Sequence, residues 1–237
     1  MDSQRIFLAR HGERADLAEA GWSSSPEGRL DPYDPPLTAR GFQQAHELGL
    51  RLQEENITQI YSSPFIRTLQ TAHQVAEVLD LSVLIEQGLC EGMLSRLFPA
   101  GPPCFKTAKQ LASKLPRARA PAQPVTSVPA FPETYSTARR RCNATAQALA
   151  RKHPNENILL VAHGLSVEYL ALSLVHQKRK GSLDIPYCCL TECIRDGPDQ
   201  DSWQFGVLMQ QDFLTQKEPL EEAQRQRRMW GLDDSTA

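Results

Sequence analysis

The 237-residue sequence contains no long apolar run, no excess of positive charge and no cysteine pattern typical of metal binding. Its most apolar stretch, residues 158–175, is interrupted by His163 and Glu168, so we interpret it as a strand followed by a helix rather than a membrane span. A formal net charge of −2 argues against a protein that neutralises the phosphates of a nucleic acid. We therefore expect no nucleic-acid partner and no membrane partner.

The N-terminus also lacks the basic and apolar segments of a secretory signal peptide. The six cysteines include no CxxC pair, so we expect reduced, buried thiols and a cytoplasmic protein rather than a disulfide framework. No internal repeat is evident and no linker divides two cores, which favours a single domain over residues 1–237. We predict neither a metal nor a cofactor, and the sequence leaves a homodimer open.

Strand-like and helix-like segments alternate along most of the chain. Short apolar segments predict strands at residues 4–9, 57–61, 83–85 and 157–162, and helical periodicity predicts a helix after each of the first, second and fourth, with another over about residues 135–153. This order indicates an α/β three-layer sandwich: a mostly parallel central sheet with helices on both faces. Residues 188–195 and 203–210 predict a hairpin that adds antiparallel strands at the sheet edge.

Three further regions have no clear apolar periodicity. Residues 15–36, rich in Ser, Pro, Gly and Asp, predict a loop beside the end of the first strand. Residues 92–134 are rich in proline and predict an insertion, part loop and part irregular helix, which covers the active crevice. The tail at residues 218–237 alternates acidic and basic residues, which is typical of a solvated or frayed helix.

Charged side chains follow each of the four predicted strands. Arg10 and His11 follow the first, Glu91 follows the third, His163 follows the fourth, and Arg67 lies in the first turn of the helix after the second. Ligands of open α/β sheets bind outside the carboxyl ends of the strands, and arginine matches phosphate oxygens through a planar fork of donors. Each residue alone is as typical of an ordinary surface or core position, but together they indicate a phosphate site.

The chemistry of such a site follows from these residue types. Histidine forms covalent intermediates, so His11 is a candidate nucleophile, and adjacent positive charge should lower its pKa and keep its lone pair free. Glu91 could donate a proton to the leaving oxygen and then activate water. A phosphomonoester carries about −1.5 to −2 charges at neutral pH, which the arginines and His163 can neutralise without a metal. We expect Glu13 to orient an arginine.

The motifs Arg10-His11-Gly12, Ser62-Ser63-Pro64 leading to Arg67, and Val161-Ala162-His163-Gly164 resemble the signatures of the histidine phosphatase (phosphoglycerate-mutase-like) superfamily. Further segments resemble one branch, which comprises the phosphatase domain of the suppressor of T-cell receptor signalling proteins and the ecdysteroid-phosphate phosphatases. These segments are His11-Gly12-Glu13-Arg14, Tyr33-Asp34-Pro35-Pro36-Leu37-Thr38, Leu89-Cys90-Glu91 and Ile185-Pro186-Tyr187 with Trp203. The resemblance implies a phosphate pocket made of Arg10, His11, Arg14, Arg67, Glu91 and His163.

The sequence thus predicts a metal-independent phosphomonoesterase that works through a phosphohistidine on His11. Its substrate would be a phosphotyrosine protein or a small aryl or steroid phosphate. Two alternatives stay open: a phosphosugar phosphatase or mutase of the same fold, and a phosphate-binding or scaffold domain with little turnover.

Overall fold

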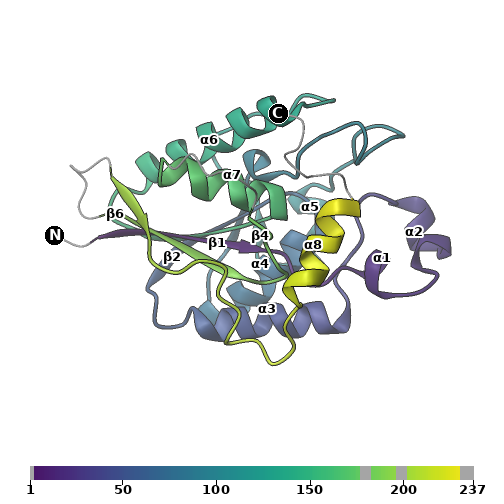
Figure 1. The fold of residues 1–237 in the computed structure, drawn as a ribbon, viewed down its shortest axis with the longest axis horizontal. Coiled ribbons are helices and arrows are strands. Elements are labelled where there is room, and N and C mark those ends of the chain that lie inside the picture. The colour runs from purple at the N-terminus through teal and green to yellow at the C-terminus, as the bar shows by residue number, and fades with distance from the viewer. Residues whose placement is uncertain (1–2, 177–182, 196–201, 230–237) are drawn as a thin grey trace.

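The computed structural model describes residues 3–176, 183–195 and 202–229. Its centre is a seven-stranded sheet with the strand order β4-β3-β2-β5-β1-β6-β7 (Figure 1). The first five in this order are parallel: β4 (Ala118–Arg119), β3 (Val83–Ile85), β2 (Ile57–Ser62), β5 (Asn157–Ala162) and β1 (Gln4–Arg10). β6 (Leu190–Arg195) pairs antiparallel with β1, and β7 (Trp203–Phe205) pairs antiparallel with β6. The predicted mostly parallel α/β sheet with an antiparallel edge is confirmed.

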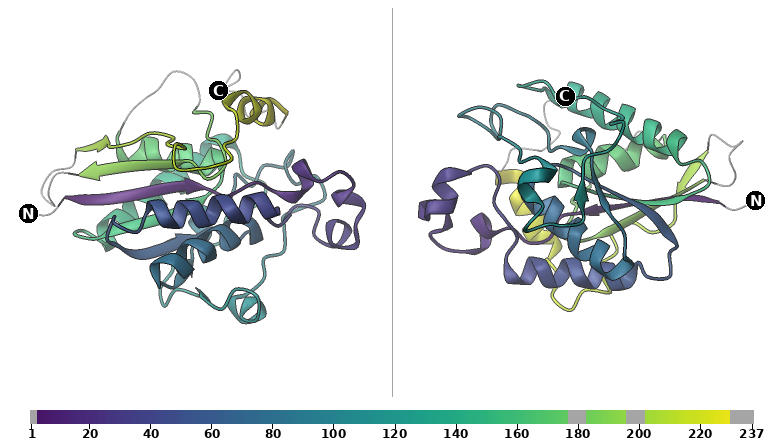
Figure 2. Two further views of the ribbon diagram at one scale, coloured as in Figure 1. Left: turned by 90° about the horizontal axis from the view of Figure 1, so that it is seen from below. Right: turned by 180° about the vertical axis from the view of Figure 1, so that it is seen from behind.

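Helices cover both faces of this sheet, as the sequence predicts (Figure 2). Ile6 and Leu8 of β1 pack into a core shared with α6 (Tyr135–Lys152) and α7 (Gly164–Leu174). Phe7 and Ala9 alternate with them and pack on the other face, against α3 (Ala39–Arg51) and α4 (Ile66–Leu79). Side chains of a strand point alternately to its two faces, so a strand covered on both sides reads as a continuous apolar run.

The carboxyl ends of β1, β5 and β2 lie side by side, which gathers the residues that follow them. Arg10 is opposite Ala162 and Ser62 is opposite Val161 in the sheet register. The backbone N–H of His11 then donates to the carbonyl of Ala162 at 3.1 Å, and that of Ser63 to the carbonyl of Val161 at 3.0 Å. His11, Ser63 and His163 therefore meet at one edge of the sheet.

The helix predicted after the first strand is confirmed as α3, which Thr38 caps, because its hydroxyl accepts from the N–H of Gly41 at 3.0 Å. The predicted hairpin strands are present but shorter than expected. β6 begins at Leu190 and β7 ends at Phe205. Residues 196–201, between these two strands, lie outside the described residues.

Residues 15–36 were expected to form a loop, and this prediction is wrong in part. The segment contains α1 (Ala15–Ala18), the 3-10 turn η1 (Trp22–Ser24) and α2 (Pro26–Leu30). α2 forms despite its composition because Ser25 caps it, accepting from the N–H of Gly28 at 3.0 Å, and because proline suits the first position of a helix.

Residues 92–134 are mostly irregular, as expected, with two short regular elements. α5 (Ala108–Leu111) begins with a capping box between Thr107 and Gln110. β4 extends the sheet beyond β3, which the sequence did not predict because the strand has only two residues. The 3-10 turn η2 (Gln87–Leu89) precedes this segment and leads from β3 towards Glu91.

The C-terminal segment is not simply solvated, which corrects the sequence prediction. α8 (Leu220–Met229) buries Ala223, Gln226 and Arg227 against the rest of the molecule. Two of these residues are polar, and Arg227 is paired with Glu168 of α7 at 2.9 Å. Hydrophobic periodicity could not identify this buried face because hydrogen bonds and ion pairs hold it.

All six cysteines are free thiols, and five of them are buried as predicted. Cys104 is exposed, contrary to the prediction, because it lies in an irregular part of residues 92–134 away from the core. Among the described residues, no helix has both the length and the apolar composition that a membrane crossing requires.

Candidate active site

The structure brings all six predicted site residues together at the carboxyl edge of the sheet. Arg10 ends β1 and His11 follows it, His163 follows β5, and Arg67 is the second residue of α4. The imidazole rings of His11 and His163 are 5.4 Å apart between centroids, in an edge-on arrangement. A small cavity is lined by Arg10, His11, Arg14 and Glu91 together, with walls from α7 and α8.

The ring of His11 has one defined tautomer. Its Nδ1 donates to the carbonyl oxygen of Gly12 at 2.8 Å, which leaves the lone pair on Nε2. The residue is only 2% exposed, and burial, followed by the charges of Arg67 and Arg10, lowers its pKa well below the ordinary value. His11 is therefore neutral at physiological pH, the form that a nucleophilic nitrogen requires.

The turn after His11 requires glycine at position 12. A Cβ on Gly12 would lie 2.5 Å from the carbonyl oxygen of Gly41, and this oxygen belongs to backbone that cannot move aside easily. The close approach of the loop to α3 fixes the carbonyl that holds Nδ1 of His11. The geometry of the candidate nucleophile therefore depends on the absence of a side chain at this position.

His163 is fully buried and also has a defined hydrogen-bond pattern. Its Nε2 donates to the hydroxyl of Ser63 at 2.8 Å, and its Nδ1 accepts from Nη2 of Arg67 at 3.2 Å. Burial and the charge of Arg67 lower the pKa of His163 well below the ordinary value. The sequence motifs included Ser63 but gave it no role, and its place beside His163 follows from the neighbouring strands β2 and β5.

Arg67 connects the two histidines. Its Nε donates to Nε2 of His11 at 3.3 Å, and the guanidinium stacks over the ring of Phe65 at 4.4 Å. Asp34 lies 3.5 Å from Nη1 and accepts from the N–H of Ile66 at 2.8 Å, so it caps α4 and pairs with Arg67 at once. Burial lowers the pKa of Arg67 to about 10, so the group remains a cation at neutral pH.

The other two arginines of the site are oriented by partners to which the sequence analysis gave no role. Nε and Nη2 of Arg14 donate to the two carboxylate oxygens of Asp16 at 2.6 and 2.7 Å. Arg10 lies over the ring of Tyr187 at 4.1 Å, and its Nε is buried without a hydrogen-bond partner. An N–H donor in this state is available to an anion that enters the site.

Glu91 faces His163 across the site. One carboxylate oxygen accepts from the N–H of Gly92 at 3.0 Å, and the other lies 3.9 Å from Nδ1 of His163. The backbone carbonyl of Glu91 accepts from Arg141 at 3.1 Å, and Arg141 forms a buried ion pair with Glu133 at 2.8 Å. This pair fixes the loop that presents Glu91, and the sequence gave no signal for it because Arg141 lies inside a polar helix.

Glu13 does orient an arginine, but this arginine is not one of the six residues of the site. Its carboxylate accepts from Nη1 of Arg40 at 3.0 Å and from the hydroxyl of Thr38 at 2.8 Å. Glu13 therefore joins the loop after β1 to the start of α3, which leaves Arg10, Arg14 and Arg67 to other partners.

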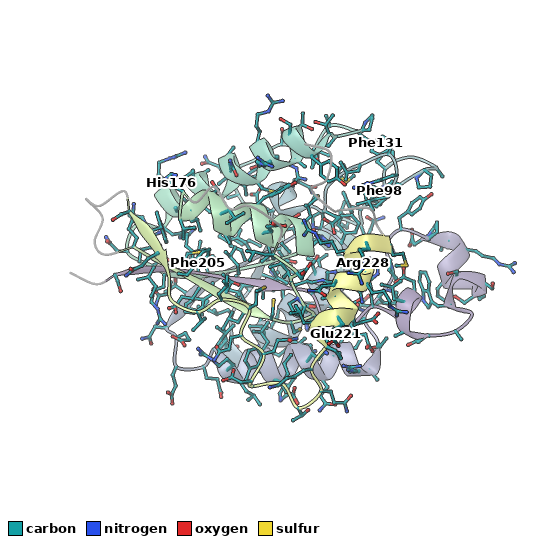
Figure 3. The ribbon with its side chains drawn as sticks, viewed as in Figure 1. Phe98, Phe131, His176, Phe205, Glu221 and Arg228 are labelled. Atoms are coloured by element: carbon teal, nitrogen blue, oxygen red, sulfur yellow. The ribbon has the colours of Figure 1, made fainter. Side chains whose placement is uncertain are left out.

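A larger cavity, of about 250 Å³, adjoins the phosphate site and shares Arg14, Arg67 and Glu91 with it. The remaining lining residues are mainly apolar or aromatic: Pro32, Tyr33, Leu97, Phe98 and Pro99, with Asp16 and Arg96. Phe98, from the segment 92–134, lies at the same end of the molecule as α8 (Figure 3). This segment therefore contributes one wall of the space next to the candidate nucleophile.

Arg10 and Arg14 line the smaller cavity, and Arg14 and Arg67 line the larger one, so all three bring positive charge to this site. Within the described part of the chain, no group of three or more His, Cys, Asp or Glu side chains could hold a metal ion. The described residues therefore offer an anion the charges of arginines rather than a set of metal ligands.

Comparisons with known proteins find relatives over most of the chain. The chain is 28% identical to the ecdysteroid-phosphate phosphatase of Drosophila melanogaster over 79% of its own length and 30% of that protein. It is 29% identical to the ubiquitin-associated and SH3 domain-containing protein B of Mus musculus, over 79% of the chain and 36% of that protein. The chain thus spans about a third of the length of these two relatives.

Among solved structures, the ecdysone phosphate phosphatase from Bombix mori in complex with tungstate matches with a TM-score of 0.73 and 20% identity. The match covers 91% of this chain and 96% of the other, and it shows a common fold. The family model of the histidine phosphatase superfamily (branch 1) matches residues 6–207. The chain therefore belongs to the histidine phosphatase superfamily, as its motifs predicted.

Proposed function

We propose that this protein is a metal-independent phosphomonoesterase that forms a phosphohistidine on His11. The observation that supports this most directly is the state of His11: neutral, with Nδ1 bound to Gly12 and with the lone pair of Nε2 facing Arg67. Arg67 and Arg10 place their positive charges beside this nitrogen, where a phosphate would be held for attack. Membership in a family of phosphatases supports the same function.

The first step transfers the phosphoryl group from the ester to His11. Nε2 of His11 attacks phosphorus and forms an N–P bond, while the P–O bond to the leaving group breaks. Arg10, Arg14 and Arg67 neutralise the phosphate dianion, which is the main contribution a protein makes to this chemistry. Glu91 donates a proton to the leaving oxygen, so the product departs as an alcohol or phenol.

The second step hydrolyses the phosphohistidine. Glu91, now a carboxylate, removes a proton from water as the water oxygen attacks phosphorus. The N–P bond breaks, its electrons return to Nε2 of His11, and inorganic phosphate is released. Glu91 regains the proton that it lost in the first step, so the enzyme returns to its starting state.

We propose that the leaving group is apolar or aromatic, as in phosphotyrosine or an aryl or steroid phosphate. The cavity next to the phosphate site supports this, because Tyr33, Leu97 and Phe98 offer an aromatic and aliphatic surface. Sugars present many hydroxyl groups that would lose water on the apolar walls of this cavity, where only Asp16 and Arg96 add hydrogen-bond partners beyond the phosphate site. Two similar phosphatases are named for ecdysteroid and ecdysone phosphates, which supports the same class of substrate.

We also propose that residues 1–237 form a single domain in which the segment 92–134 covers the phosphate site. The position of Leu97 and Phe98 in the cavity wall supports this, and so does β4, which joins the segment to the sheet. Six unpaired cysteines favour a reducing compartment such as the cytoplasm.

The experiment is a substrate panel with one catalytic control. The panel contains p-nitrophenyl phosphate, a phosphotyrosine peptide, a steroid phosphate, fructose bisphosphate and 3-phosphoglycerate. We expect the largest kcat/KM for the aryl and steroid esters and none above background for His11→Ala, with acid-labile phosphate trapped on the wild type by rapid quench. Preference for the sugar phosphate or for 3-phosphoglycerate would support the phosphosugar phosphatase or mutase, and phosphate binding without turnover would support the scaffold domain.

A further inference from the structure

We propose that Gln226, on α8, is a positioning residue that fixes Arg10 in the orientation in which it binds phosphate. The residue belongs to a C-terminal segment far from the site in sequence, and its side chain is only 6% exposed. The proposal rests on the role of Arg10 as a phosphate ligand in the proposed function, but not on which ester is hydrolysed.

The guanidinium of Arg10 is held on two edges and one face. Nη2 donates to Oε1 of Gln226 at 2.8 Å, and Nη1 donates to the carbonyl of Ile185 at 2.7 Å. The ring of Tyr187 lies 4.1 Å from the guanidinium carbon. With both terminal nitrogens engaged, Nε is left as a buried donor without a partner. Arg10 also lines the cavity that contains His11, so we assign Nε to the incoming phosphate.

The amide of Gln226 is itself oriented by a second residue of the same segment. Its Nε2 donates to Oε1 of Glu218 at 2.7 Å. Because a carboxylate only accepts, this bond places the amide nitrogen towards Glu218 and the amide oxygen towards Arg10. Glu218 is fixed in turn, since Oε2 accepts from the N–H of Tyr187 at 2.7 Å. Glu218 therefore links Gln226 to Tyr187, the residue whose ring packs on the guanidinium of Arg10.

α8 is anchored at the position next to Gln226. Nη1 of Arg227 donates to Glu168 of α7 at 2.9 Å and to the carbonyl of Leu183 at 3.2 Å. Glu221 and Arg228, labelled in Figure 3, are exposed on the same helix. Ala223, Gln226 and Arg227 line the cavity that also contains Arg10 and His11. The helix therefore forms a wall of the phosphate site and turns a polar, hydrogen-bonding face towards it.

A neutral acceptor suits this position better than a carboxylate. Glu218 already lies 3.6 Å from Nη1 of Arg10 and offsets part of its charge. A second carboxylate at 2.8 Å from Nη2, where the amide oxygen of Gln226 now lies, would weaken the attraction of Arg10 for a phosphate dianion. Glutamine orients the guanidinium without this loss.

The test compares Gln226→Met with Arg225→Met. Methionine keeps the length and helix propensity of glutamine but cannot accept from Arg10, and Arg225 is an exposed residue of the same helix. The dissociation constant of inorganic phosphate is measured by calorimetry, and inhibition by vanadate by kinetics. We expect Gln226→Met to weaken phosphate binding about tenfold, the effect of one hydrogen bond to a charged group. Arg225→Met should bind phosphate as the wild type does.

A double-mutant cycle separates positioning from general support of the fold. In an Arg10→Lys background, which lacks the guanidinium that Gln226 binds, Gln226→Met should change phosphate affinity by less than about twofold. Equal loss in both backgrounds, or wild-type affinity in Gln226→Met, would overturn the proposal. If the wild type itself binds no phosphate, the proposed function fails and this inference fails with it. Should Gln226→Met not fold, Gln226→Glu replaces it, and its phosphate affinity must fall below that of the wild type.

Discussion

Nε of Arg67 lies 3.3 Å from Nε2 of His11 and donates to it. The same guanidinium donates from Nη2 to Nδ1 of His163 at 3.2 Å, so one cation satisfies the free lone pairs of both imidazoles. Burial lowers the pKa of each histidine, and the charge of Arg67 is the next largest cause. In the proposed mechanism Arg67 therefore does two things: it attracts the phosphate and keeps the nucleophile unprotonated.

Replacing Arg67 should separate these two effects. We expect Arg67→Met to lower the rate of p-nitrophenyl phosphate hydrolysis by roughly 10³–10⁵-fold, the effect of losing an arginine that stabilises phosphoryl transfer. It should also raise the pKa of His11, because a nearby positive charge is gone. Kinetics and an NMR titration of the imidazole measure the two quantities, with Arg40→Met as the control. An unchanged pKa of His11 would show that burial alone keeps it neutral.

The two buried histidines should make the protein less stable in mild acid. Their pKa values are lowered in the folded state, so below the unfolded value of about 6.5 the unfolded chain binds more protons than the folded one. The free energy of unfolding should therefore fall as the pH falls through 6.5, while it is constant with respect to these groups above that value. Urea unfolding between pH 5 and 8 measures this slope, which should be smaller in His163→Ala.

Catalysis should be less sensitive than stability to the same change of pH. Because His11 stays neutral well below its ordinary pKa, we expect no acid limb near pH 6.5 in kcat/KM while the protein remains folded. Single-turnover rates over this range measure it. The wild type could instead show an acid limb in kcat/KM at pH 6.5 that replacing a histidine other than His11 removes without abolishing activity. That result would indicate that the other imidazole controls the reaction.

The buried pair of Arg141 and Glu133 should be important for stability and for the site. Removing one partner of a buried ion pair costs about 3–5 kcal/mol because the other charge is left uncompensated. We expect Arg141→Met to lower the free energy of unfolding by about this amount, and to reduce kcat because the carbonyl of Glu91 loses its donor. Chemical denaturation measures the first effect, and Arg139→Met on the same helix is the control. The double variant Arg141→Met/Glu133→Leu should recover part of the stability.

Chelators should leave the activity unchanged, because the proposed mechanism draws its positive charge from Arg10, Arg14 and Arg67. Vanadate should inhibit competitively, since it offers the same charged oxygens to these arginines as phosphate does. Activity is measured after dialysis against EDTA and again with added Mg²⁺, Mn²⁺ or Zn²⁺. Loss of activity on dialysis, with recovery in one of these ions, would contradict the proposal.

The sequence predicts much of this site because its residues follow strands. Apolar runs locate β1, β2 and β5, and residues at the ends of parallel strands converge, so the strand pattern alone places Arg10, His11 and His163 together. The family motifs then add Arg14. The strand pattern agrees with the observed site because both faces of the sheet are buried, which makes its strands continuous apolar runs in the sequence.

The supporting residues could not be predicted in this way. Asp34 and Gln226 act on residues distant in sequence, and Glu133 pairs with an arginine of the following helix. A polar side chain in a loop or polar helix looks the same in the sequence whether it is solvated or paired. α8 is the clearest case, because its buried face includes a glutamine and an arginine, which hydropathy assigns to water. The short helices of residues 15–36 depend on single caps such as Ser25, a signal too local for periodicity to detect.

The role of Glu91 can be tested through the leaving group. A phenolate leaves phosphate more easily than an alkoxide, since phenols ionise near pH 10 and alcohols far higher. General acid catalysis is worth about 10²–10⁴-fold and matters most for the more basic leaving oxygen. We therefore expect Glu91→Gln to slow transfer from an alkyl phosphate severely, while p-nitrophenyl phosphate keeps a clear part of its rate. Single-turnover measurements isolate this transfer step.

The comparison must be confined to that step because Glu91 also acts in hydrolysis of the phosphohistidine. In steady state, Glu91→Gln should therefore accumulate phosphohistidine with p-nitrophenyl phosphate, visible as a burst of nitrophenol. If aryl and alkyl esters lose the same factor in single turnover, Glu91 supports the pocket and another group donates the proton. A burst with normal alkyl transfer would assign Glu91 to the hydrolytic step alone.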